Sequence, residues 1–149
     1  FRTELMIFDL DLKITGSIDM LFIDPADGQL VMMDWKRLNK PMERTTQFNK
    51  YSTHPLLRHL PDTNLWHYAM QQNIYKYLLQ KNYGFTVKEM YLVAMHHTMD
   101  RYAKHEVPDL QREIGLLFEE RLRRLNGVPD PEPEPQDEVE ALDLSQCIL

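Results

Sequence analysis

Two aspartates and a lysine lie within the apolar stretch Ile14–Arg37, at Asp19, Asp34 and Lys36. Paired carboxylates are suitable ligands for a hard divalent cation such as Mg²⁺ or Mn²⁺, which fills its remaining positions with water and substrate phosphate. Such an ion polarises a phosphoryl oxygen and lowers the pKa of bound water. A lysine ammonium can hold the attacking water or stabilise the charge that develops on the phosphate. These residue types therefore predict metal-assisted hydrolysis of a phosphate ester.

The segment between the two aspartates contains a turn that predicts which residues face each other. Pro25 presets the turn dihedral, and Gly28 accepts the left-handed conformation. If a four-residue loop joins two antiparallel strands here, the numbers of opposite residues sum to 53, and Asp19 faces Asp34 with Cβ atoms ~5 Å apart. Lys36, two residues further, points to the same face. Burying these charges without partners costs several kcal/mol, which favours a bound ligand.

Strands and helices predicted on either side of this hairpin give an α/β fold with a mixed sheet. Met20 and Phe22 are expected to pack against a helix layer, because they alternate with Asp19 along their strand. After the hairpin, a helix and a right-handed crossover should bring the next strand parallel to the strand of Asp34. The expected elements are a first strand at Glu4–Leu10 that completes an antiparallel three-strand meander, a helix at Asn64–Tyr83 ended by Gly84, a strand at Val87–Met95 and a helix at Pro108–Asn126 with the stripe Leu110, Ile114, Leu117, Phe118, Leu122 and Leu125.

The helix predicted over residues 64–83 carries Tyr68, Gln71 and Tyr75 on one face. A glutamine on an inward aromatic stripe needs hydrogen-bond partners. The alternative is that Gln71 lies at the edge of the stripe, in water.

Three other side chains are weaker candidates for the site, and two further histidines are not candidates. Glu4 could reach the acidic pair, or end its strand in solvent. His96 and His97 directly follow a predicted strand and could line the site, or end that strand in water. His54 is expected at the surface, as is His59, because neither has a partner at recognisable ligand spacing.

Charge is unevenly distributed along the 149 residues, whose formal net charge is -6. Residues 1–127 are expected to form the domain and residues 128–149 an acidic tail rich in proline and glutamate, with seven acids and no base. From Lys36 to Lys81 there are eight bases and two acids, which indicates a phosphate-bearing partner or, alternatively, a solvated charged surface.

Cysteine use and hydropathy exclude several classes of protein. The single cysteine, Cys147, excludes an internal disulfide framework and a cysteine zinc site, and favours a reducing, intracellular compartment. No apolar run approaches the ~20 residues that span a membrane. The sequence starts at Phe1 and not at methionine, so we expect it to be an excerpt of a longer chain.

Together these residues resemble the PD-(D/E)XK nucleases, especially the RecB-like branch, and within it the nuclease domains of large DNA viruses and mobile elements. That family has G-x-(I/V)-D on one strand, (D/E)-x-K on the next and Q-x-x-x-Y on the following helix. The matching segments here are Gly16–Asp19, Asp34–Lys36 and Gln71–Tyr75, and the likeness spans residues 4–97.

The resemblance implies a restriction-endonuclease-like core and a role for each matched residue. Asp19 and Asp34 would bind Mg²⁺ or Mn²⁺ together with the Trp35 backbone carbonyl, and Lys36 would assist the nucleophilic water. Gln71 and Tyr75 would position the substrate backbone or the lysine. The implied partner is nucleic acid, DNA favoured over RNA. A helicase or replication module in the same chain is also implied, with a role in replication, recombination or repair.

Two departures from the family pattern leave other functions open. Aspartate stands at position 34, where glutamate is more usual, and a helix that normally precedes the first strand is missing from the sequence. One alternative is a catalytically silent nucleic-acid-binding module of the same fold. The other is an RNA endonuclease, because the acidic pair and lysine read phosphate and not sugar.

Overall fold

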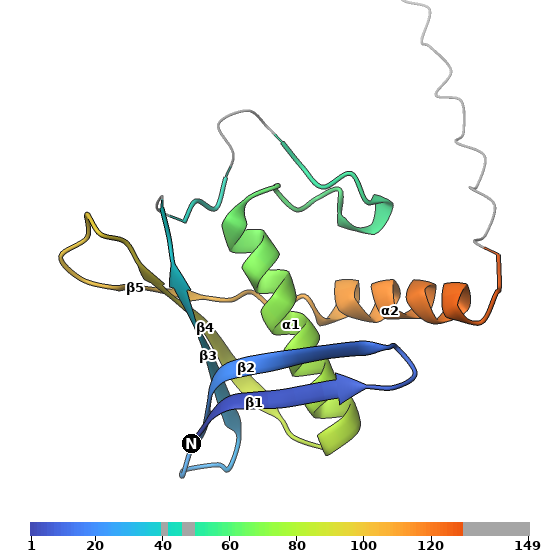
Figure 1. The fold of residues 1–149 in the computed structure, drawn as a ribbon, viewed down its shortest axis with the longest axis horizontal. Coiled ribbons are helices and arrows are strands. Elements are labelled where there is room, and N and C mark those ends of the chain that lie inside the picture. Colours follow the sequence, from blue (N-terminus) through green and yellow to red (C-terminus); the bar gives the residue numbers. More distant parts are fainter. Residues whose placement is uncertain (40–41, 46–49, 130–149) are drawn as a thin grey trace, which may run out of the picture.

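The computed structural model describes residues 1–39, 42–45 and 50–129. One five-stranded mixed sheet, in the order β1-β2-β3-β4-β5, carries the two α-helices (Figure 1). The elements are β1 (Arg2–Asp9), β2 (Ile14–Ile23), β3 (Leu30–Arg37), the 3₁₀ turn η1 (Pro55–Leu57), α1 (Asn64–Tyr83), β4 (Val87–Met95), β5 (Ala103–Glu106) and α2 (Gln111–Leu125). The predicted α/β class, with a meander followed by a helix and a further strand, is confirmed.

The turn between β2 and β3 has the register that the sequence predicts. The amide of Asp24 donates to the carbonyl of Gln29 at 2.8 Å, and Gly28 has φ +71°. Opposite residues run from Ile23 and Leu30 to Met20 and Met33, so their numbers sum to 53.

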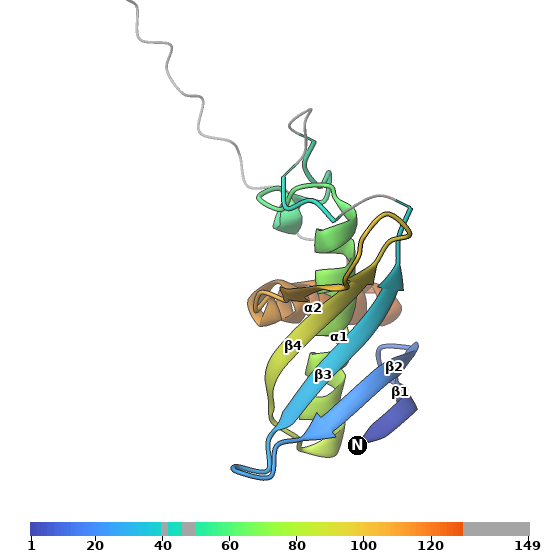
Figure 2. The same ribbon diagram turned by 90° about the vertical axis from the view of Figure 1, so that its left-hand side faces the viewer.

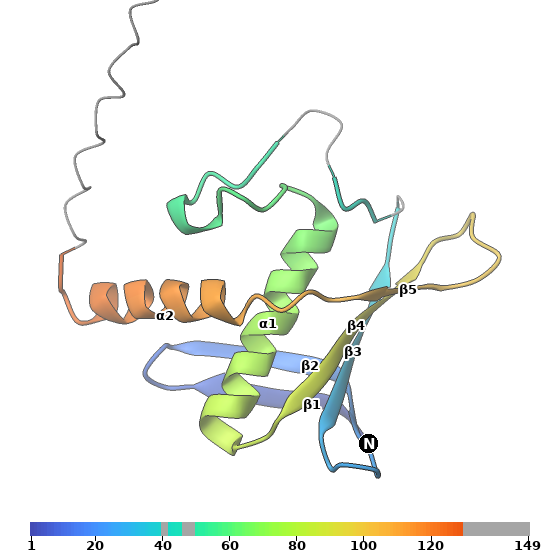
Figure 3. The same ribbon diagram turned by 180° about the vertical axis from the view of Figure 1, so that it is seen from behind.

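Helix α1 has the predicted bounds and makes the crossover to β4. Gly84 ends it in the left-handed conformation at φ +69°, and its amide caps the carbonyl of Leu79. Strand β4 then pairs parallel to β3, with Asp34 beside Leu92. Helix α1 covers one face of the sheet (Figures 2 and 3), and its buried residues Leu78 and Leu79 belong to the hydrophobic core.

Helix α2 extends sideways from the middle of α1 (Figure 3). The rings of Tyr77 and Phe118 meet edge to face at 4.9 Å between the two helices. The Oδ1 atom of Asn73 on α1 accepts a hydrogen bond of 2.9 Å from the Leu110 amide, and its Nδ2 donates one of 2.9 Å to the Pro108 carbonyl. These two bonds fix the chain that leads into α2.

The prediction that Met20 and Phe22 pack against the helix layer is wrong. Leu21 between them is buried in the core, and so is Ile18 three positions earlier. Both cannot share a face in a regular two-residue alternation, so the alternation of β2 changes phase between them. Asp19 lies at that change, opposite Glu4, which has φ +50° and interrupts the pairing of β1 with β2.

Two further features differ from the sequence prediction. Strand β5 was not predicted, because its four residues are mostly polar and its pairing with β4 supplies no local pattern. Helix α2 begins at Gln111, three residues after Pro108, and Leu125 of the predicted stripe is 38% exposed. Within the described residues, no helix is long and apolar enough to cross a membrane.

Candidate active site

Asp19 and Asp34 meet where β2 and β3 lie side by side. The ladder between these strands ends at Met20 and Met33, and the same register continued by one residue places Asp19 opposite Asp34. The Oδ2 atom of Asp19 accepts a hydrogen bond of 3.0 Å from the amide of Trp35. The Asp19 carboxylate therefore lies against the peptide group that joins Asp34 to Trp35.

Asp34 is the more deeply buried of the two aspartates, with 2% of the residue exposed. The Nζ atom of Lys36 lies 2.6 Å from Asp34 Oδ2 and forms an ion pair with it, and no other group of the described residues donates a hydrogen bond to this oxygen. Burial raises the pKa of Asp34, the attraction of Lys36 works against that rise, and the Asp19 charge adds to it.

Lys36 connects the sheet to α1 through a chain of side chains. Its Nζ donates to Gln71 Oε1 at 3.1 Å, and Gln71 Nε2 donates to the Tyr75 hydroxyl at 3.0 Å. The ammonium also lies 4.6 Å from the centre of the Tyr68 ring, where a cation–π attraction acts on it. With 18% of its side chain exposed, Lys36 is held in place yet reaches solvent.

Gly16 allows β2 to approach this chain of side chains. A Cβ atom at residue 16 would lie 2.9 Å from Tyr75 Cζ and closer still to Cε1. The glycine is therefore needed for the close packing of Tyr75 on β2. The structure thus brings Asp19, Asp34, Lys36, Gln71 and Tyr75 into one site, built from β2, β3 and α1.

The residues of the site fit a small hard cation. The buried Asp34 supplies one carboxylate and Asp19 a second, and the adjacent Trp35 carbonyl could add an oxygen. Among the described residues no three His, Cys, Asp or Glu side chains gather as a metal cluster. A site with two carboxylates suits Mg²⁺, which keeps several waters and binds substrate oxygens.

Among the described residues, none of the weaker candidates completes a metal cluster with the two aspartates. Glu4 stands opposite Asp19 but is exposed, and its carboxylate accepts a hydrogen bond of 3.2 Å from Ser17 Oγ. The His96 ring contacts the Asn39 carbonyl at 2.7 Å and Thr98 Oγ1 at 2.6 Å, and it stacks on His97.

The two histidines that were expected at the surface contact acidic residues of α2. His54 Nε2 lies 3.4 Å from Glu120, and His59 Nε2 lies 3.3 Å from Glu113. These contacts attach the segment before α1 to α2.

The sequence did not single out Gln72, the neighbour of Gln71. Gln72 is 0% exposed, and neither the oxygen nor the nitrogen of its side-chain amide has a hydrogen-bond partner among the residues that the structure describes. The sequence signal for a buried Gln72 was the pair of adjacent glutamines. Two adjacent helical residues point in different directions, so if Gln71 reaches Lys36, Gln72 must point elsewhere.

No protein-family model matches the sequence, and no curated protein matches it. Among solved structures, the chain is similar to SSO0001, with a TM-score of 0.45 and 19% identity over 86% of this chain and 51% of that one. It is also similar to a protein titled "Putative exonuclease" from Eubacterium rectale, with a TM-score of 0.49 and 15% identity over 99% of this chain and 57% of that one. The chain thus spans about half the length of these two structures.

Proposed function

We propose that this chain is a metal-dependent nuclease domain that hydrolyses DNA phosphodiester bonds. The observation that carries the proposal is the continuous contact from Asp19 through the Asp34–Trp35 peptide to Lys36 and on to Gln71. Membership of the RecB-like branch of the PD-(D/E)XK nucleases is part of the proposal. So is a place beside a helicase or replication module in a longer, intracellular protein.

Asp19, Asp34 and the Trp35 carbonyl would hold Mg²⁺ or Mn²⁺. When bound, the ion polarises the phosphoryl oxygen and lowers the pKa of a coordinated water. A cation would add a second positive charge beside Asp34, next to the Lys36 ammonium, and so offset the free-energy cost of burying that carboxylate.

Lys36 supplies a compact positive charge at the place where the reacting phosphate gains negative charge. Gln71 Oε1 and the Tyr68 ring keep this ammonium from rotating freely, and Tyr75 in turn holds the Gln71 amide. Lys36 is thus preorganised, so little free energy is lost in orienting it during the reaction.

Cleavage of labelled oligonucleotides tests the proposal. We expect Mn²⁺-dependent cleavage of DNA that EDTA abolishes and that Asp34→Ala lacks, with Asp130→Ala as a carboxylate control. An RNA oligonucleotide and a circular DNA, assayed in parallel, report sugar preference and endonuclease action.

The possible results separate the three functions. Retention of DNA by the wild type in Ca²⁺, without turnover in Mn²⁺, would favour the silent binding module. Cleavage restricted to RNA would favour the RNA endonuclease.

A further inference from the structure

A small pocket lies beside the first half of α1. It has a volume of about 190 Å³ and is lined by Tyr51, Ser52, Thr53, Leu57, Leu60, Pro61, Asp62, Trp66, His67 and Met70. Pockets that enclose a whole small ligand hold about 300–1,000 Å³. This one suits a single flat ring system.

Residues 50–62, here called the arm, form one wall of the pocket and are firmly held. The Asp62 amide donates to the Lys50 carbonyl at 2.9 Å, and the Ser52 amide donates to the Leu60 carbonyl at 3.0 Å, so the two ends of the arm pair. The contacts of His54 and His59 with α2 hold the arm from the other side.

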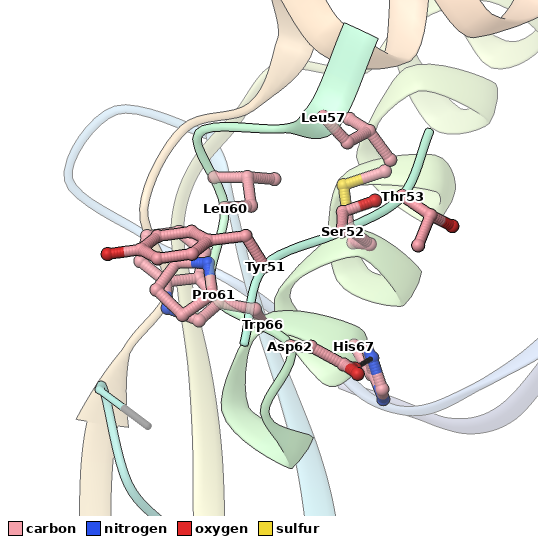
Figure 4. Close-up of a pocket in the computed structure, with 10 residues that line it drawn as sticks. Tyr51, Ser52, Thr53, Leu57, Leu60, Pro61, Asp62, Trp66 and His67 are labelled. Atoms are coloured by element: carbon pink, nitrogen blue, oxygen red, sulfur yellow. Dashed lines mark ion pairs between the residues drawn. The ribbon is translucent and has the colours of Figure 1, made fainter. Parts of the chain in front are cut away.

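The pocket has aromatic and apolar walls with polar groups at its rim. Figure 4 shows Tyr51, Pro61 and Trp66 together on one side, with Ser52 and Thr53 across from them and the Asp62–His67 ion pair at the lower edge. Leu60 is only 6% exposed, whereas Tyr51 is 50% exposed and offers its ring to an incoming ligand. Aromatic rings beside polar groups are the usual surroundings of an unstacked nucleobase.

The pocket lies within reach of the candidate active site along α1. His67 lines the pocket, and Gln71 follows it by four residues, so their Cβ atoms are separated by about one helical turn, roughly 5–6 Å. Met70 lines the pocket directly before Gln71. Gln71 in turn contacts Lys36, so a strand whose phosphate lies at Lys36 passes the pocket along α1.

Cationic side chains lie on the arm and beside it. Arg44, whose carbonyl accepts the Trp66 indole N–H at 3.0 Å, is exposed, and so are Lys50 and Arg58. Their charge suits the phosphates on either side of a base inserted into the pocket.

We propose that this pocket binds one unpaired base of the substrate strand, with Tyr51 as the stacking platform, so that the domain acts on single-stranded nucleic acid or frayed ends. The inference rests on the proposed nuclease function, because the strand is placed by its scissile phosphate at Lys36. A paired base cannot enter a pocket of this size without leaving its duplex.

The test measures binding of a fluorescein-labelled single-stranded DNA 12-mer in Ca²⁺, with the matching duplex alongside. We expect Tyr51→Ala to weaken single-strand binding about tenfold, the loss of one base–aromatic stack, and to leave duplex binding unchanged. Tyr51→Phe, which keeps the ring, should bind as the wild type does. Tyr102→Ala is the matched control, since that tyrosine is 66% exposed and lies outside the pocket.

An abasic scan makes the test independent of any general loss of binding. One abasic position should weaken the wild type about tenfold and leave Tyr51→Ala no weaker than it already is, because the same stack is lost in both. Equal losses for single strand and duplex, an abasic effect that persists in Tyr51→Ala, or no binding of either DNA would each overturn the proposal.

Cleavage in Mn²⁺, run beside the binding assay, keeps the two proposals apart. A wild type that cleaves DNA with no dependence on Tyr51 defeats the pocket proposal alone. A wild type that shows the Tyr51-dependent base effect and never cleaves defeats the nuclease proposal and leaves the pocket as a binding site.

Discussion

Lys36 is the residue at which catalysis can be separated from binding. The proposed metal ligands are Asp19, Asp34 and the Trp35 carbonyl, so Lys36→Ala should retain Mn²⁺ binding. Turnover should fall by roughly a hundredfold or more, the loss typical of removing one charge-stabilising donor. Lys36→Arg should not restore it, because a planar guanidinium cannot replace a compact ammonium between Asp34 and Gln71.

The measurement for Lys36 is single-turnover cleavage in Mn²⁺, with DNA binding followed in Ca²⁺. DNA binding should weaken only modestly, because the segment from Lys36 to Lys81 keeps seven other bases. Lys104→Ala on β5 is a suitable control for the loss of one lysine. Cleavage by Lys36→Ala at the wild-type rate would remove the lysine from the mechanism.

Asp34 should make the stability of the metal-free domain depend on pH. Its pKa is raised above 3.8 in the folded state, so the folded protein loses stability as the pH rises from about 3.8 through that higher pKa, and the loss is constant above it. Asp34→Asn should therefore raise the free energy of unfolding at pH 7, with a smaller gain near pH 4.

In Mn²⁺ the wild type should instead be more stable than Asp34→Asn. At 100 times its dissociation constant the ion should stabilise the wild type by ~2.7 kcal/mol and the Asp34→Asn variant by much less. Urea unfolding of both proteins at pH 7 and pH 4, with and without Mn²⁺, gives the four free energies of unfolding for each. If the metal-free variant is less stable at pH 7, or if Mn²⁺ shifts both proteins equally, Asp34 is not a strained ligand.

At the scale of elements, the approach of β2 to α1 depends on one missing side chain. Gly16→Ala would place a methyl group against the buried Tyr75 ring, and we expect a loss of about 1–3 kcal/mol in the free energy of unfolding. Cleavage should fall too, because Tyr75 would shift and release Gln71. Urea unfolding and single-turnover cleavage measure the two effects.

Gly115 on α2 is the matched control for this substitution, because a Cβ atom there would meet nothing within 4 Å. Gly115→Ala should stabilise its helix by up to about 1 kcal/mol. Replacing Tyr75 by leucine in the Gly16→Ala background should recover part of the lost stability but not the cleavage rate. A Gly16→Ala variant as stable as the wild type would show that β2 and α1 can move apart freely.

The sequence predicts elements well where a local signal fixes them. The Pro25–Gly28 turn determines the β2–β3 register, and Gly84 determines the end of α1. The phase change in β2 has no such signal, because it depends on the conformation of Glu4 in the neighbouring strand. The contact between Lys36 and Gln71, 35 residues apart, was expected only through family resemblance, since periodicity places Gln71 on a helix face but names no partner.

At the scale of the whole molecule, charge is divided between the nearly neutral residues 1–128 and the acidic residues 129–149, the predicted tail. Residues 1–128 hold 16 acids and 17 bases, since all seven remaining acids of the 23 lie beyond residue 128. Truncation after residue 128 should therefore strengthen DNA binding at low ionic strength, because seven negative charges that repel phosphate are removed. At 0.5 M salt the difference should largely vanish through screening.

Anisotropy titrations at several salt concentrations check the tail prediction. Replacing all seven acids by their amides in the full chain is the control for the loss of residues as such, and should match the truncation. Equal affinity of the full and truncated chains at low salt would show that the tail charges act too far from the bound DNA to matter.

Asp34 lies on β3, which is hydrogen-bonded on both sides, to β2 and to β4. Its backbone pairs with Leu92 of β4, and its neighbour Met33 is the last residue paired with β2, so it cannot shift toward an arriving ion without disturbing this pairing. Asp19 is tied to the same segment through the Trp35 amide. Ion entry is then governed by how fast the hydrated cation sheds water. We therefore expect Mn²⁺, which exchanges its waters faster than Mg²⁺, to associate faster, with no slow conformational phase in stopped-flow traces of either ion.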